Sequence, residues 1–142
     1  MNVVLDAPVV IAAALTKGVC RTVFLETVEK HELIISQAIV EDYAQMTTRK
    51  QFKAYKDPLK QVILMICELG RLVPLSPSLF PLPHPEDSKY LALTENGAPS
   101  LLVTLSKDRF PEDTYGSIQV LSPKAFLDEM NNDRLENSYD SP

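Results

Sequence analysis

Short apolar runs alternate with longer segments of helical periodicity along most of the chain. Runs of roughly four to eight hydrophobic residues, bounded by polar or turn-forming residues, are typical of buried β-strands. We therefore predict five strands, at Asn2–Leu5, Glu32–Ser36, Arg71–Leu75, Ser100–Leu105 and Ser117–Leu121. The third should lie at an edge of the sheet, because Pro74 has no N–H to donate to a neighbouring strand.

The segments between these runs carry hydrophobic residues at helical spacing. We predict helices at Pro8–Ala14, Val19–Lys30, the segment after Ser36, Pro58–Leu69, Asp87–Asn96 and from Pro123 to about Met130. Ser36 is expected to cap the third helix, because a serine hydroxyl can accept a hydrogen bond from an unpaired N–H of the first turn. Gly70 is expected to end the fourth helix in the usual C-terminal position. Strands that alternate with helices predict an α/β fold with a parallel sheet between helical layers.

The length of 142 residues suits one domain, which we place at residues 1–130. Residues 131–142 are polar and are expected to form a disordered tail. The net charge of −5 argues against a general nucleic-acid-binding protein, since such proteins are usually basic. The charge is uneven, however: the chain from Asp128 onward carries five acids and one base, which leaves the remainder close to neutral.

The apolar start of the chain, MNVVLDAPVVIAAALTKG, differs from a secretion signal. It has no basic leading region, and Asp6 and Pro8 interrupt the apolar run. No apolar run approaches the roughly 20 residues that are needed to span a bilayer. We therefore expect a cytoplasmic protein with no membrane segment.

Four aspartates lie at predicted strand ends or near helix starts: Asp6, Asp42, Asp87 and Asp108. Ligands of parallel sheets bind beyond the carboxyl ends of the strands, so these side chains could meet there. A site made of carboxylates suits Mg²⁺ or Mn²⁺, which can activate a water molecule and neutralise a phosphodiester. Each aspartate also has a simpler interpretation: a strand-end turn for Asp6, the border of a solvated helix for Asp42, a helix cap for Asp87 and a plain loop for Asp108.

Basic residues recur between the third and fourth predicted helices. Arg49, Lys53, Lys56 and Lys60 follow one another at four, three and four residues, and Lys50 is beside them. On a continuous helix this spacing would give a basic stripe able to meet the phosphates of RNA. Asp57 and Pro58 interrupt the segment, and a solvated helical face explains the pattern equally well.

Four motifs in this order resemble the PIN-domain family, in particular its toxin-like branch. VVLDAPVVIAAAL resembles the family's first strand, Asp-Thr-Asn triplet and small-residue helix, with Asp6 as the first acid. SQAIVEDYAQMTTRKQF resembles its serine-led helix and places Asp42 where the family usually has Glu. HPEDSKYLALTENGA resembles its third motif, with Asp87 as the third acid.

The fourth motif, LLVTLSKD, resembles a strand followed by Thr-Gly-Asp-x-Asp. It aligns Thr104 with the threonine, Ser106 with the first aspartate and Asp108 with the second. The ending YGSIQVLSPKAFLDEM resembles the family's closing strand and helix, so the resemblance extends from Val3 to about Met130.

The resemblance implies a three-layer α/β/α sandwich with a mostly parallel five-stranded sheet, a Mg²⁺ or Mn²⁺ site, and hydrolysis of RNA. It assigns the catalytic and metal-binding roles to Asp6, Asp42, Asp87 and Asp108, with Thr104 and Ser106 beside them.

Three positions depart from the family pattern: Ala7 replaces the threonine and Pro8 the asparagine of the first triplet, and Ser106 replaces an aspartate. The loss of a negative charge weakens a site for a hard cation.

The leading hypothesis is a metal-dependent endoribonuclease, such as the toxin of a toxin–antitoxin pair. Its partners would be RNA, an antitoxin protein and a second copy of the chain, and the candidate RNA-binding residues are Arg49, Lys50, Lys53 and Lys56. The alternative is a catalytically degenerate PIN-like module that binds RNA or a protein. A third hypothesis is an interaction protein whose acidic tail contacts a basic partner.

Overall fold

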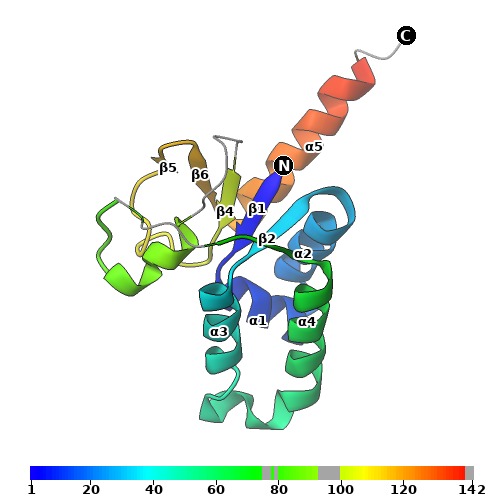
Figure 1. Ribbon diagram of the computed structural model, residues 1–142. Coiled ribbons are helices and arrows are strands. Elements are labelled where there is room, and N and C mark those ends of the chain that lie inside the picture. Colours follow the sequence, from blue (N-terminus) through cyan, green and yellow to red (C-terminus); the bar gives the residue numbers. More distant parts are fainter. Residues whose placement is uncertain (75–77, 79, 93–99, 140–142) are drawn as a thin grey trace.

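The computed structural model describes residues 1–74, 78, 80–92 and 100–139 of an α/β protein (Figure 1). Its elements, in chain order, are β1 (Asn2–Leu5), α1 (Ala7–Leu15), α2 (Val19–Lys30), β2 (Glu32–Ile35), α3 (Gln37–Met46), the 3₁₀ helix η1 (Lys50–Tyr55), α4 (Lys56–Leu69), β3 (Arg71–Leu72), the 3₁₀ helix η2 (Pro85–Tyr90), β4 (Ser100–Val103), β5 (Thr114–Tyr115), β6 (Ile118–Leu121) and α5 (Pro123–Tyr139).

The described residues form one mixed sheet of six strands in the order β3-β2-β1-β4-β6-β5. Four neighbouring pairs are parallel, and β5 is antiparallel to β6. The prediction of five mostly parallel strands is therefore corrected to six strands in a mixed sheet. The strand β5 was not predicted, because it has only two residues. Gly116, at φ 60°, supplies the left-handed conformation that turns the chain back from β5 into β6.

The strands β1, β2, β4 and β6 confirm four of the predicted strands, within one or two residues at their ends. β3 is shorter than predicted, and Leu75 lies outside the described residues. Instead of the α-helix predicted at Asp87–Asn96, the chain forms η2, which begins at Pro85 and ends at Tyr90. The predicted end of that helix falls on residues 93–99, which also lie outside the described part of the chain.

The last helix is longer than predicted. We expected it to end near Met130 and the polar residues after it to be disordered, whereas α5 continues to Tyr139. No glycine or proline interrupts this helix after Pro123, and adding residues to an established helix is far easier than starting a new one. Polar composition alone therefore does not end it.

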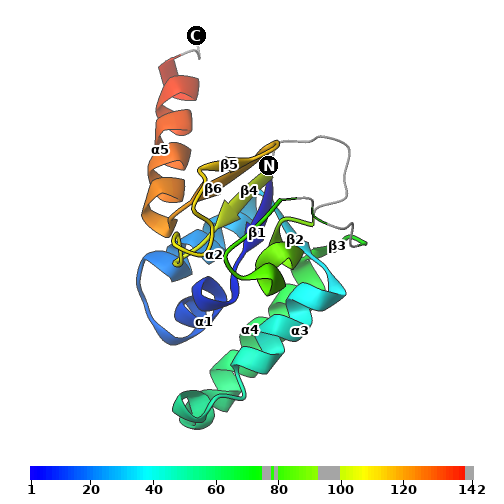
Figure 2. The same ribbon diagram turned by 90° about the vertical axis from the view of Figure 1, so that its left-hand side faces the viewer.

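The helices pack around α1, which contacts α2, α3 and α4, and α2 in turn contacts α5. The Tyr43 hydroxyl, fully buried on α3, donates a hydrogen bond to the carbonyl of Leu5 and so ties α3 to the end of β1. Together α3, η1 and α4 form a hairpin that extends away from the sheet (Figures 1 and 2). No single helix among the described residues is long and apolar enough to cross a membrane; α1 and α2 pass that test only as a pair bent by 105°.

Gly70 ends α4 with an extended backbone, at φ −76° and ψ 147°, so it is not needed for a left-handed cap. Instead, a Cβ at this position would lie 2.7 Å from the Ile66 carbonyl oxygen and 2.9 Å from Cδ1 of Ile35. We expect Gly70→Ala to lower the free energy of unfolding by about 1–3 kcal/mol, because the backbone oxygen cannot move aside easily. Urea unfolding measures the change.

Gly18→Ala is the matched control, since its Cβ would meet only Thr16 Oγ1 at 3.7 Å. The free energy of unfolding of this variant should differ from that of the wild type by no more than about 1 kcal/mol, because the lower entropy of the unfolded chain offsets the weaker cap that alanine gives α2. Equal stability of the two variants would show that the contact at Gly70 relaxes without cost.

Candidate functional site

The strand order reverses between β1 and β4, two parallel neighbours at the centre of the sheet. Such a switch point leaves a crevice beyond the carboxyl ends of the strands, where α/β proteins bind ligands. Asp6 follows β1 and Thr104 follows β4, so both lie at this crevice. A pocket of about 270 Å³ lies there, and its lining includes Asp6, Asp42, Asp87, Ser106 and Arg109. We call it the carboxylate pocket.

Asp6 is held by groups on both sides of the switch point. Its Oδ1 accepts a hydrogen bond from the Val9 N–H at 3.2 Å, which caps α1, and its Oδ2 accepts one from the Thr104 hydroxyl. The side chain is buried, and this burial raises the pKa of Asp6 from 3.8 to about 6. The charge of Asp87 raises the pKa further, while the two hydrogen bonds lower it.

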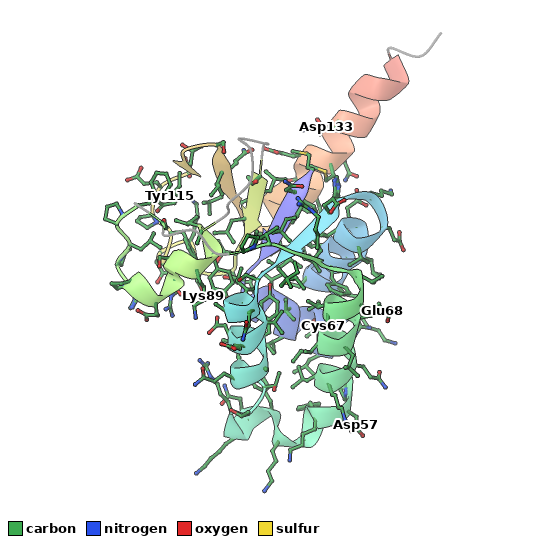
Figure 3. The ribbon with its side chains drawn as sticks, viewed as in Figure 1. Asp57, Cys67, Glu68, Lys89, Tyr115 and Asp133 are labelled. Carbon is green, nitrogen blue, oxygen red and sulfur yellow. The ribbon has the colours of Figure 1, made fainter. Side chains whose placement is uncertain are left out.

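Asp42 reaches the carboxylate pocket from α3 and contacts two residues of η2. The Tyr90 hydroxyl donates a hydrogen bond to its Oδ2, and the Lys89 ammonium lies 3.4 Å from its Oδ1. Figure 3 shows Lys89 beside α3, on the side that faces η2. Burial is the largest cause of the raised pKa of Tyr90, so its hydroxyl stays protonated and remains a donor.

Asp87 comes from η2 and is paired with a cation from the loop after β4. The Arg109 Nε donates to Asp87 Oδ2 at 2.6 Å, and its Nη2 lies 3.3 Å from Oε1 of Glu86. The Asp87 side chain is only 11% exposed, whereas that of Arg109 is 37% exposed. The hydrogen bond to Asp87 is the main cause of a raised pKa for Arg109, which therefore remains a cation.

The fourth motif contributes fewer residues to the carboxylate pocket than expected. Thr104 is buried and binds Asp6, and its Oγ1 accepts a hydrogen bond from the Ser106 N–H at 2.9 Å. Ser106 lines the carboxylate pocket, but Asp108 does not, and it is exposed. The structure thus brings Asp6, Asp42, Asp87 and Ser106 together and leaves Asp108 outside.

A divalent cation can be tested against these contacts. The donors are hard oxygen atoms of the kind that Mg²⁺ and Mn²⁺ prefer. Their arrangement does not fit such an ion, because Asp42 is paired with Lys89 and Asp87 with Arg109. Among the described residues, no group of three or more His, Cys, Asp or Glu side chains could hold a metal ion.

The basic residues form a separate feature at the end of the α3–α4 hairpin. We call Arg49, Lys50, Lys53, Lys56 and Lys60 the basic tip; all five are exposed, and none forms an ion pair with a residue that the structure describes. They do not form the stripe on one continuous α-helix that the spacing suggested, because the 3₁₀ helix η1 separates α3 from α4. Arg49 also lines the carboxylate pocket and so joins the two features.

The groups that pair with the carboxylates were not predicted from the sequence: the cations Lys89 and Arg109, and the neutral hydrogen-bond donor Tyr90. Each lies within three residues of a predicted acid, since Lys89 and Tyr90 follow Asp87 and Arg109 follows Asp108. Their position beside the acidic motifs was a usable signal. Their partners could not be inferred, because each pairing joins segments far apart along the chain.

Comparison with known proteins adds no relative. No protein-family model matches the chain, no curated protein is significantly similar to its sequence, and no solved structure matches its fold. The resemblance to the PIN family therefore stays a prediction from the four sequence motifs.

Proposed function

We propose that the chain is a PIN-like module that binds RNA through the basic tip and the adjoining carboxylate pocket. The observation that carries this proposal is the basic tip itself: five exposed cations without ion-pair partners among the described residues, one of which reaches the pocket. Lysine and arginine side chains in this state can exchange their counter-ions for RNA phosphates. The three-layer α/β/α sandwich and a cytoplasmic location belong to the same proposal.

Two features make binding a better proposal than hydrolysis. The carboxylates Asp42 and Asp87 are paired with cations of the chain itself, and Ser106 stands where the PIN motif has an acid. The exposed aromatic ring of Tyr55, which lies between Lys53 and Lys56 in the sequence, offers a surface on which an unpaired base can stack. Single-stranded RNA is therefore the form that suits this surface best.

A second candidate is a metal-dependent endoribonuclease, such as a toxin with an antitoxin partner and a second copy of itself. Asp6, Asp42 and Asp87 come from three different motifs and line one pocket, which favours this candidate. A strongly raised pKa such as that of Asp6 is also typical of functional carboxylates.

One experiment separates the two candidates. A fluorescently labelled single-stranded RNA is mixed with the wild-type chain or with Asp6→Asn, in EDTA, Mg²⁺ or Mn²⁺. Anisotropy reports binding, and a denaturing gel reports cleavage. If the chain is an RNA-binding module, both proteins should bind the RNA in EDTA and neither should cleave it.

Cleavage by the wild type that requires the metal and is lost in Asp6→Asn would establish the nuclease instead. Neither binding nor cleavage would reject both candidates.

A further inference from the structure

We propose that Arg109 is the resident cation of the carboxylate pocket and keeps divalent ions out of it. This inference goes beyond RNA binding and does not depend on it. The guanidinium lies in a pocket lined by Asp6, Asp42 and Asp87 and supplies positive charge to these carboxylates.

The geometry of the guanidinium supports this proposal. Arg109 donates from Nε to Asp87 at 2.6 Å and from Nη2 to Glu86 at 3.3 Å, so it holds two neighbouring acids of η2 at once. The bond to Asp87 is a short charge-assisted hydrogen bond, a kind that is among the strong ones in proteins. A metal ion that used the same Asp87 oxygen would have to break the shorter bond.

The fold fixes the position of Arg109, which is not a loosely attached surface residue. Its N–H donates to the Ser106 carbonyl at 2.9 Å, which closes a turn. The next residue, Phe110, is buried and makes an edge-on contact with Tyr90 of η2, with 6.4 Å between the ring centroids. This contact joins the Arg109 turn to the helix that carries Asp87.

The positive charges that line the pocket also oppose a divalent ion. A divalent ion bound to Asp6 and Asp87 would lie close to the guanidinium, and two positive charges in a partly buried pocket repel each other strongly. Lys89, whose ammonium lies 3.4 Å from Asp42, adds a second positive charge to the lining of the pocket. Removal of the Arg109 charge should therefore turn the pocket into a site for a divalent ion.

The test measures Mn²⁺ binding by titration calorimetry and by the electron paramagnetic resonance signal of unbound Mn²⁺. We expect Arg109→Gln to bind Mn²⁺ at least about tenfold more tightly than the wild type. Arg109→Lys keeps the charge and should bind as weakly as the wild type. The double variant Arg109→Gln/Asp87→Asn should lose the gain.

Equal Mn²⁺ affinity of the wild type and Arg109→Gln would overturn the proposal, as would a gain that persists in the double variant. Circular dichroism confirms that each variant is folded. A second measurement leaves Arg109 in place: its Nε–H should exchange slowly with solvent in the NMR spectrum of the wild type and quickly in Asp87→Asn. The same exchange rate in both would also contradict the proposal.

Discussion

Replacement of Lys50, Lys53 and Lys56 by glutamate should weaken the binding of single-stranded RNA by at least about 100-fold at about 50 mM salt. Each lysine that neutralises a phosphate contributes to affinity through the release of counter-ions, and each glutamate adds repulsion. A loss of about 1 kcal/mol per position already gives a factor of this size. The affinity is measured by fluorescence anisotropy at several salt concentrations.

The dependence on salt gives an independent check of the same prediction. The slope of log affinity against log salt changes by about 0.7 for each phosphate contact on a single strand. The slope measured for the triple variant should therefore be smaller in magnitude than that of the wild type by about two. The control replaces three exposed lysines elsewhere by glutamate, and so makes the same change in net charge. These are Lys17, Lys30 and Lys124. If the control weakens binding as much as the tip variant does, the affinity for RNA depends on the net charge of the protein and not on the basic tip.

The Asp6→Asn variant should be more stable than the wild type at a pH of about 7.5, by about 3 kcal/mol. The pKa of Asp6 is about 6 in the folded chain, against an ordinary value of 3.8, and one pKa unit corresponds to about 1.36 kcal/mol. Between these values the folded state binds more protons than the unfolded state. The stability of the wild type should therefore fall as the pH rises from about 4 to about 6, and stay lower above it.

Asparagine should remove this pH dependence, because it is neutral and can still accept the Val9 N–H. Urea unfolding of both proteins across this pH range, with EDTA present to exclude metal ions, measures the difference. Asp108→Asn is the control: this aspartate is exposed and should change stability by less than about 0.5 kcal/mol. Parallel pH profiles for the wild type and Asp6→Asn would mean that burial does not raise the pKa of Asp6 as described.

Several elements could be predicted because their signals are local. Helix α2 begins at Val19 and ends at Lys30 as predicted, and Ser36 accepts the N–H of Ile39 at 3.2 Å as the expected cap of α3. Buried strands such as β4 are short hydrophobic runs that hardly depend on what surrounds them. The helix at Asp87 was predicted wrongly, because two turns of periodicity do not distinguish an α-helix from the 3₁₀ helix η2.

The candidate site was predicted in part for a similar reason. Acids that follow parallel strands lie near the same edge of the sheet, and this rule predicted the position of Asp6. The spacing of hydrophobic residues on the helix predicted that Asp42 faces inward, and it lines the same pocket. Asp108 was placed wrongly, because it lies in a turn after β4. The strand does not fix the direction in which that turn runs. Gly70 shows a further limit: its place after α4 was predicted, but the need for glycine comes from Ile35 and Ile66, which only the folded chain brings close.

The sequence by itself determined the alternation of strands and helices, the position of Asp6 at the end of β1, and the presence of a basic segment after α3. These features depend on neighbouring residues, whose spacing and chemistry are visible in the chain. Only the tertiary structure decided that Arg109 pairs with Asp87, that Lys89 pairs with Asp42, and that Arg49 reaches the same pocket. The physical reason is that an ion pair forms where two side chains meet in space, and the folding of distant segments sets that meeting.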